Sequence, residues 1–293
     1  MANYLRAAAL LLASTILPSC APVDALNATV SLDGVSVQHD IAYAPGADGG
    51  MDVYRPAGAG EKLPLVVFIY GGSWRSGSKN DYRFVAAPLA RRGFVVAVPD
   101  YRKVPSVRFP AFLQDNAKAV AFARDHAAAW GADPGRVFLI GHSAGAYDVL
   151  MLGFDPQYLA AFGVASRDLA GVVALAAPAD FLPFDDADVI AAFGHVADPE
   201  LTQPGHFAAN PAPPLLLLHG GVDDIVYPRN SIAMERKVRA AGGDAELLTY
   251  PDLGHIGIVT AFAPVFQGRS SVLEDVVAFL RRHSGAGARA PGL

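Results

Sequence analysis

Short, uninterrupted apolar runs recur along this chain, and stretches with helical spacing separate them. A strand with one face in water alternates apolar and polar residues, whereas a continuous apolar run indicates a strand that is buried on both faces. Strands are buried in this way in a parallel sheet that carries helices on both sides. The runs are LPLVVFIY (63–70), FVVAVPD (94–100), RVFLIG (136–141), GVVALAA (171–177), PLLLLHG (214–220) and AELLTYP (245–251).

Two further β-rich stretches, 35–44 and 51–56, precede these runs and predict an antiparallel entry into the sheet. Between the runs, apolar residues recur at helical spacing, as at Leu113, Ala117 and Val120. The expected fold class is therefore α/β, with a mostly parallel central sheet of about eight strands and helices on both faces. In such sheets, ligands bind beyond the carboxyl ends of the strands.

The first residues differ in character from the rest. One positive side chain precedes an apolar run over 7–17 that is too short to span a membrane as a helix, so 1–19 is interpreted as a signal peptide of the lipoprotein type. Cys20, the only cysteine, stands where such a signal places the acylated residue. We therefore expect a bacterial envelope protein, lipid-anchored at Cys20 on the periplasmic face of the membrane. An ordinary signal peptide, with a soluble periplasmic or secreted product, is the alternative.

The remaining chain is expected to form one domain, because 52% of the residues are hydrophobic and can fill one large core. We place a tether at 20–28, the domain at 29–284 and a flexible Gly- and Ala-rich tail at 285–293. One stretch, 178–213, departs from the alternation and is rich in aromatic, Asp and Pro residues. We interpret it as a small cap insertion over the strand ends, with a surface loop as the alternative.

Ser143 lies in LIGHSAGA (139–146), between an expected strand and an expected helix over 144–152. A chain with 29 glycines can contain a G-x-S-x-G pattern by chance, so the elements around it decide its meaning. A sharp turn here would raise the hydroxyl group above the sheet, and Gly141 and Gly145 would avoid collisions with the neighbouring strand and helix. Ser143 is therefore the candidate nucleophile.

The glycine-rich residues IYGGSW follow the run at 63–70 directly. Backbone N–H groups in such a loop can point toward Ser143 and stabilise the charge that develops on a carbonyl oxygen under attack. We expect an oxyanion hole at Gly72 and Ser73, completed by the N–H group of Ala144. The alternative is a plain turn at the end of a strand.

An acid and a base are expected downstream, in that order. Asp223 comes just after the run at 214–220, and His255 comes just after the run at 245–251, so both lie at the carboxyl edge of the sheet. Asp224 competes with Asp223 for the role of the acid. The H-G-x-x-D spacing from His219 favours Asp223.

Several classes of function are disfavoured. The formal net charge is −5 and no basic stripe is present, which argues against a nucleic acid partner. No H-E-x-x-H pattern or cysteine cluster suggests a metal hydrolase, and we expect neither a metal nor a cofactor. A lone cysteine also implies that the exported chain has no internal disulfide bond.

The motifs DVYRP, YGGSW, PDYR, GHSAGA and HGGVDD together resemble the α/β-hydrolase superfamily over nearly the whole exported chain. More narrowly, they resemble the carboxylesterase branch that contains feruloyl-esterase-like proteins and kynurenine formamidases. The resemblance implies that an ester or amide is hydrolysed through an acyl-enzyme. Two positions depart from the pattern: Tyr70 replaces a common His, and Ala146–Tyr147 replaces a common Gly-His.

We therefore expect a serine esterase that cleaves small esters with short acyl chains. The candidate pocket residues are Trp74, Tyr147, Phe181 and Phe193. The alternatives are an arylformamidase or amidase of the kynurenine formamidase type, a non-catalytic envelope binding protein on the same fold, and a peptidase of the prolyl-oligopeptidase kind, for which the chain has no propeller-sized region. The leaving group and the oligomeric state stay open.

Overall fold

The computed structural model describes residues 21–58, 60, 62–209 and 211–285. The expected signal peptide, the candidate lipidation site Cys20 and the tail beyond residue 285 lie outside these residues, so they stay predictions. Within the described ranges, no helix is both long enough and apolar enough to cross a membrane.

The domain begins earlier than the expected boundary at residue 29. Residues assigned to the tether form helix α1, Ala21–Ala28, which packs beside the segment that follows β3. Asn27 holds the helix there, because its Nδ2 donates to the carbonyl oxygens of Asn80 and Asp81, each at 3.0 Å, and its Oδ1 accepts from the Phe84 N–H group at 3.1 Å. A single amide side chain thus satisfies three main-chain groups, which explains why this segment is ordered against the domain.

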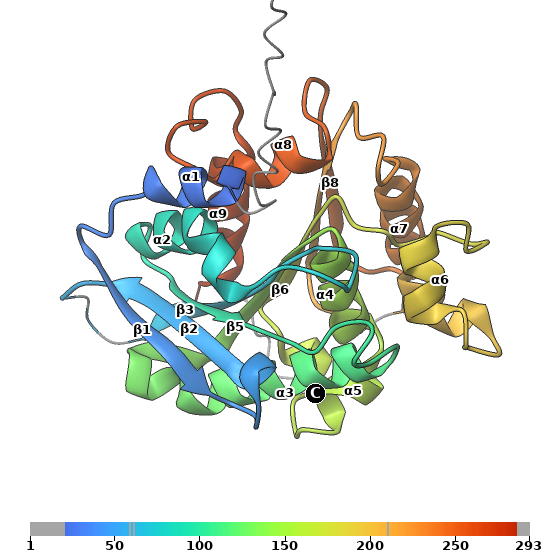
Figure 1. The fold of residues 1–293 in the computed structure, drawn as a ribbon, viewed down its shortest axis with the longest axis horizontal. Coiled ribbons are helices and arrows are strands. Elements are labelled where there is room, and N and C mark those ends of the chain that lie inside the picture. Colours follow the sequence, from blue (N-terminus) through green and yellow to red (C-terminus); the bar gives the residue numbers. More distant parts are fainter. Residues whose placement is uncertain (1–20, 59, 61, 210, 286–293) are drawn as a thin grey trace, which may run out of the picture.

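Among the described residues, eight strands form one sheet in the order β1-β2-β4-β3-β5-β6-β7-β8 (Figure 1). The pairs β1–β2 and β2–β4 are antiparallel, and the other pairs are parallel. The expected α/β fold with an antiparallel entry is therefore confirmed. The strands are β1 (Val35–Ala42), β2 (Gly50–Pro56), β3 (Leu63–Ile69), β4 (Val95–Pro99), β5 (Ala132–His142), β6 (Gly171–Leu175), β7 (Leu215–Gly220) and β8 (Ala245–Tyr250).

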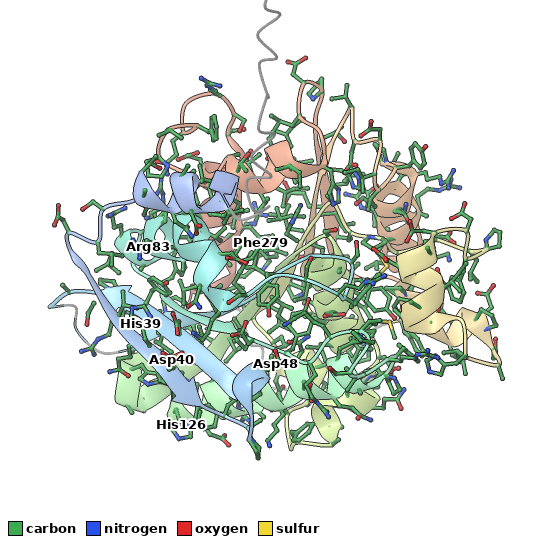
Figure 2. All side chains as sticks on the ribbon, viewed as in Figure 1. His39, Asp40, Asp48, Arg83, His126 and Phe279 are labelled. Carbon is green, nitrogen blue, oxygen red and sulfur yellow. The ribbon has the colours of Figure 1, made fainter. Side chains whose placement is uncertain are left out.

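Five of the six continuous apolar runs occupy the middle of the sheet, but the run at 245–251 forms the edge strand β8. Only Ala245 of β8 is buried, so the expected burial on both faces is wrong for this strand. Every residue of β4, β6 and β7 is buried, whereas the edge strand β1 is largely exposed. Figure 2 shows side chains filling the space on both sides of the sheet, and it labels Phe279, which packs over the start of β6. A Cβ atom on Gly171 would lie 2.8 Å from the Phe279 ring, so this strand starts with a glycine to admit the ring.

Helices cover both faces of the sheet (Figure 1). Helices α1, α2 and α9 lie on one side, and α3, α4 and α5 lie on the other, while α7 packs on β7 and β8. The helices after α1 are α2 (Arg83–Arg91), α3 (Ala111–His126), α4 (Ala144–Phe154), α5 (Pro156–Ala160), α6 (Ala187–Phe193), α7 (Arg229–Ala240), α8 (His255–Thr260) and α9 (Val272–His283).

The segment 178–213 connects β6 to β7 and contains α6 with two short 3₁₀ helices, Pro199–Thr202 and Pro204–Phe207. Contacts with α7 and with the loop after β3 hold its first half beside the carboxyl ends of the strands. Asn230 Oδ1 on α7 accepts from the N–H groups of Ala179 and Asp180 at 3.1 and 2.8 Å. In addition, Asp188 on α6 forms an ion pair of 2.5 Å with Arg75 in the loop after β3.

Candidate active site

Ser143 occupies the sharp turn between β5 and α4. Its backbone dihedral angles are φ 55° and ψ −122°, a strained conformation for a residue other than glycine. A Cβ atom on Gly141 would lie 2.2 Å from the carbonyl oxygen of Gly145, and a Cβ atom on Gly145 would lie 2.1 Å from that of Ile69. Only glycine fits at these two positions, so the motif allows a turn that holds Ser143 at the edge of the sheet.

His255 and Asp223 continue a chain of hydrogen bonds from Ser143. Nε2 of His255 lies 2.8 Å from the Ser143 Oγ atom, and Nδ1 lies 2.9 Å from the Asp223 Oδ2 atom. Asp223 follows β7 and His255 follows β8, and both side chains are buried. The structure thus brings together the three residues that the sequence singles out, in a geometry that can activate a serine hydroxyl group.

Asp223, and not Asp224, faces the histidine. The second oxygen of Asp223, Oδ1, accepts from the N–H groups of Ile225 and Val226 at 3.0 and 2.9 Å, which fixes the orientation of the carboxylate. Asp224 is exposed and makes no hydrogen bond or ion pair with the part of the chain that the structure describes. Asp223 is therefore the only one of the two that can orient His255.

Two buried histidines support the site from behind. His142 Nε2 donates to the carbonyl oxygen of His255 at 3.0 Å, and His219 Nε2 donates to that of Val226 at 2.7 Å. Burial lowers the pKa of His142 to about 3 and also lowers the pKa of His219, so both rings are neutral at pH 7. His142 fixes the backbone at the base and His219 fixes the loop of the acid, and neither adds positive charge.

The loop after β3 also lies beside Ser143, and three consecutive residues of this loop have positive φ angles. Gly72, Ser73 and Trp74 have φ angles of 125°, 53° and 55°. Ser73 and Ala144 line one cavity with Ser143, and Gly72 directly precedes Ser73 in the loop. Within the described ranges, the N–H groups of Gly72, Ser73 and Ala144 have no hydrogen-bond acceptor. These amides are therefore available to a negatively charged oxygen next to Ser143.

A cavity of about 260 Å³ opens beside Ser143. Trp74 forms one wall, the start of the 178–213 segment forms another, and the residues that follow Asp223 form a third. No group of three or more His, Cys, Asp or Glu side chains in the described ranges is placed to hold a metal ion. The apolar lining consists of Trp74, Ala144, Pro178, Phe181, Leu182, Pro183, Val189, Ile225, Val226 and Tyr227.

One known protein family matches more than half of this chain. The BD-FAE family model matches residues 51–238, which include Ser143, Asp223 and the loop after β3. The chain belongs to the BD-FAE family. His255 lies outside the matched range, so its place in the site rests on the geometry.

Two relatives of this BD-FAE member are esterases by name, and a third is a formamidase. The chain is 24% identical over 86% of its length to the isoprenylcysteine alpha-carbonyl methylesterase ICME of Arabidopsis thaliana, and 26% identical over 73% to the esterase LipQ of Mycobacterium tuberculosis. It spans less than two thirds of these relatives, namely 64% and 55% of their lengths. A kynurenine formamidase of Danio rerio is 30% identical over 39% of this chain and 37% of its own.

Solved structures share the fold. An esterase B from Lactobacillus rhamnosis, with a bound tributyrin phosphonate inhibitor, superposes with a TM-score of 0.78 at 22% identity, over 90% of this chain and 91% of that chain. A truncated carbohydrate esterase from gut microbiota gives a TM-score of 0.76 at 22% identity, over 87% and 98%. At this identity the likeness establishes the α/β-hydrolase fold.

Two of the four candidate pocket residues do not line the cavity. Trp74 and Phe181 do, but Tyr147 and Phe193 are fully buried behind them. The Phe193 ring packs edge-on against Trp74 with centroids 4.8 Å apart, and Tyr147 packs in the same way at 5.3 Å. In this BD-FAE member, Tyr147 and Phe193 therefore support the pocket wall and do not contact the cavity.

Tyr70, which replaces the common His, anchors the base of the loop after β3. Its hydroxyl group donates to Asp100 Oδ1 at 2.7 Å and accepts from Lys103 Nζ at 3.0 Å. The hydroxyl group of Tyr101 donates to the carbonyl oxygen of Tyr70 at 2.9 Å. Tyr70 thus provides a buried polar anchor below the loop.

Asp148 is a buried residue of the site that the sequence analysis misses. Its Oδ1 accepts from Trp74 Nε1 at 3.1 Å, and its Oδ2 accepts from Asn116 Nδ2 at 2.9 Å. No cation contacts it in the described ranges, and burial raises the pKa of Asp148 well above its usual range, which favours the neutral acid. Asn116 Oδ1 is buried without a partner, and exchanging its amide atoms would let a protonated Asp148 donate to it.

Replacing Asp148 should reveal this buried network. We expect Asp148→Asn, which is neutral and of the same shape, to change the free energy of unfolding by less than about 1 kcal/mol. Asp148→Ala should lower it by about 2–4 kcal/mol, because Trp74 Nε1 and Asn116 would be left buried without partners. Urea unfolding measures both values.

The exposed Asp125 on the neighbouring helix α3 provides the control. Asp125→Ala should shift the free energy of unfolding by no more than about 0.5 kcal/mol. Equal and large losses for Asp148→Asn and Asp148→Ala would show that the carboxylate charge, and not the hydrogen-bonded shape, is what the structure needs.

Proposed function

We propose that this chain is a serine esterase that cleaves short-chain carboxylic esters through an acyl-enzyme intermediate. The observation that carries the proposal is the continuous hydrogen-bonded chain from Ser143 through His255 to Asp223, at 2.8 and 2.9 Å. Three unbonded amide N–H groups beside Ser143 support it. The names of the relatives support hydrolysis of esters as the reaction class.

In the first half of the proposed reaction, Ser143 Oγ attacks the carbonyl carbon while His255 Nε2 takes the hydroxyl proton. The N–H groups of Gly72, Ser73 and Ala144 stabilise the negative charge on the carbonyl oxygen. His255 then gives its proton to the leaving oxygen, the ester C–O bond breaks, and the acyl group remains on Ser143.

In the second half, a water molecule attacks the acyl-enzyme with His255 again as the base, and the carboxylic acid leaves. Asp223 accepts the Nδ1–H group of His255 in both halves. This contact keeps the proton off Nε2 in the resting state and stabilises the charged ring once Nε2 is protonated. Besides the ester and a water molecule, the proposed reaction involves only side chains and backbone amides of this chain.

The size of the cavity supports short acyl chains. Its volume of about 260 Å³ is below the roughly 300–1,000 Å³ of pockets that hold drug-sized ligands. Phe181, Leu182 and Val189 close it on the side of the 178–213 segment. Each methylene group that enters contributes about 0.8 kcal/mol until the space is filled, and longer chains then lose rate.

A series of p-nitrophenyl acetate, butyrate, octanoate and palmitate tests the proposal. We expect kcat/KM to peak at acyl chains of roughly two to six carbons and to fall steeply beyond them. Phe181→Ala should move the peak to longer chains, because it removes a ring from the cavity wall.

Phe162→Ala serves as the matched control, since Phe162 is an exposed ring that does not line the cavity. A maximum at palmitate would contradict the compact acyl site. N-formylkynurenine belongs in the same panel because of the formamidase relative and the aromatic wall of the cavity. If it is hydrolysed far faster than every ester, the chain is an arylformamidase.

A further inference from the structure

Large apolar side chains gather on the surface around the base and acid of the candidate site. Val222, Ile225, Tyr227 and Ile256 are 61%, 64%, 52% and 57% exposed, and they are four of the nine most exposed large apolar side chains in the described ranges. Val222 precedes Asp223 and Ile256 follows His255. We call these four residues the apolar rim. Ile225 and Tyr227 line the cavity beside Ser143, and Val222 and Ile256 are the direct neighbours of the acid and the base. Scattered apolar residues are ordinary on a surface, but several together next to a site mark a candidate binding surface.

The apolar rim is held in a fixed place. The Val222 N–H group donates to the carbonyl oxygen of Leu253 at 3.2 Å, which joins the Asp223 loop to the His255 loop. The Ile225 N–H group donates to Asp223 Oδ1 at 3.0 Å, so the carboxylate that orients His255 also fixes the rim. The rim therefore presents a preformed surface, and a ligand would not have to order it.

The direction of proton transfer identifies what this surface contacts. In the proposed reaction, His255 Nε2 gives its proton to the oxygen of the leaving group, so that oxygen must come within hydrogen-bond distance of Nε2. The rest of the leaving group must then extend over the surface next to His255. That surface is the apolar rim, of which Ile225 and Tyr227 also form one wall of the cavity. The acyl group is directed toward the opposite walls, which Trp74, Phe181 and Val189 form.

We propose that the apolar rim binds the alcohol part of the substrate, and that the physiological substrates are esters of uncharged, apolar alcohols. This inference rests on the proposed esterase function. Because the rim is an open surface, it removes about half of the area of each methylene group from water. This burial in the transition state corresponds to a gain of about twofold in kcat/KM per methylene. An alcohol longer by four methylenes should therefore gain about fifteenfold.

Ethyl, butyl and hexyl butyrate test this, because they share one acyl group and the three alcohols leave with similar ease. The released butyrate is titrated at substrate concentrations where each ester is dissolved as monomers. We expect kcat/KM for the hexyl ester to exceed that for the ethyl ester by about fifteenfold. In the double variant Val222→Ser with Ile256→Ser, this ratio should fall to about fourfold or less, because two of the four apolar contacts are lost.

Ile232→Ser provides the matched control, since Ile232 is 44% exposed on α7 but does not line the cavity. It should keep the wild-type ratio of hexyl to ethyl ester. A flat ratio in the wild type, or a ratio that the double variant leaves unchanged, would overturn the role of the rim while the esterase function stands. Failure to hydrolyse any ester would instead remove the proposed function, and the inference with it.

Discussion

Ser143→Ala is expected to lower kcat for p-nitrophenyl butyrate by about 10⁴-fold or more, with the fold intact. Alanine keeps the Cβ atom and removes only the Oγ atom that lies 2.8 Å from His255 Nε2. No other hydroxyl group in the described ranges is hydrogen-bonded to His255, so no nucleophile could replace it. The residual rate would come from substrate binding and the amide groups of the oxyanion site.

Ser106→Ala is the matched control, because Ser106 is exposed and lies outside the cavity lining. It should leave kcat within about twofold. The unfolding midpoint of Ser143→Ala should equal or exceed that of the wild type. The substitution removes only the hydrogen bond between Ser143 Oγ and His255 Nε2, which belongs to the active site. Near-normal turnover by Ser143→Ala would reject the serine mechanism.

The sheet and the three hydrogen-bonded residues were predictable because parallel strands bring their carboxyl ends to one edge. Asp223 and His255 each follow a buried strand, so residues 32 positions apart had to approach each other once the strands paired. Gly141 and Gly145 marked the turn around Ser143 for a steric reason that one sequence can reveal. In each case, the information lies in local patterns and in the topology that they imply.

The lining of the pocket could not be predicted in the same way. Helix α4 is buried along its whole length, so its apolar pattern does not tell which side Tyr147 faces. Asp148 stands out as the only acid within this helix, but a single acid in a sequence does not indicate its partners Trp74 and Asn116. Exposure of the apolar rim likewise depends on tertiary packing, because no pattern separates an exposed isoleucine from a buried one.

Asp223→Asn should be almost as damaging as the loss of the serine. The Oδ1 position of Asp223 accepts two backbone N–H groups, from Ile225 and Val226, at 3.0 and 2.9 Å. An asparagine must place its amide oxygen there, because an NH₂ group would face two donors. Its NH₂ group would then point at His255 Nδ1, which would have to accept, and the ring proton would move to Nε2. A ring with its proton on Nε2 cannot take the proton of Ser143.

We therefore expect Asp223→Asn to lower kcat by about 10⁴-fold with little change in KM, since the substituted atom contacts the base and not the substrate. Asp224→Asn is the matched control, because it makes the same change one residue away on a side chain that is exposed and does not contact His255. It should keep kcat within about twofold. The measurement is the steady-state hydrolysis of p-nitrophenyl butyrate by both variants. If Asp224→Asn were the more damaging of the two, the acid would be Asp224 and the loop would have to rearrange when the substrate binds.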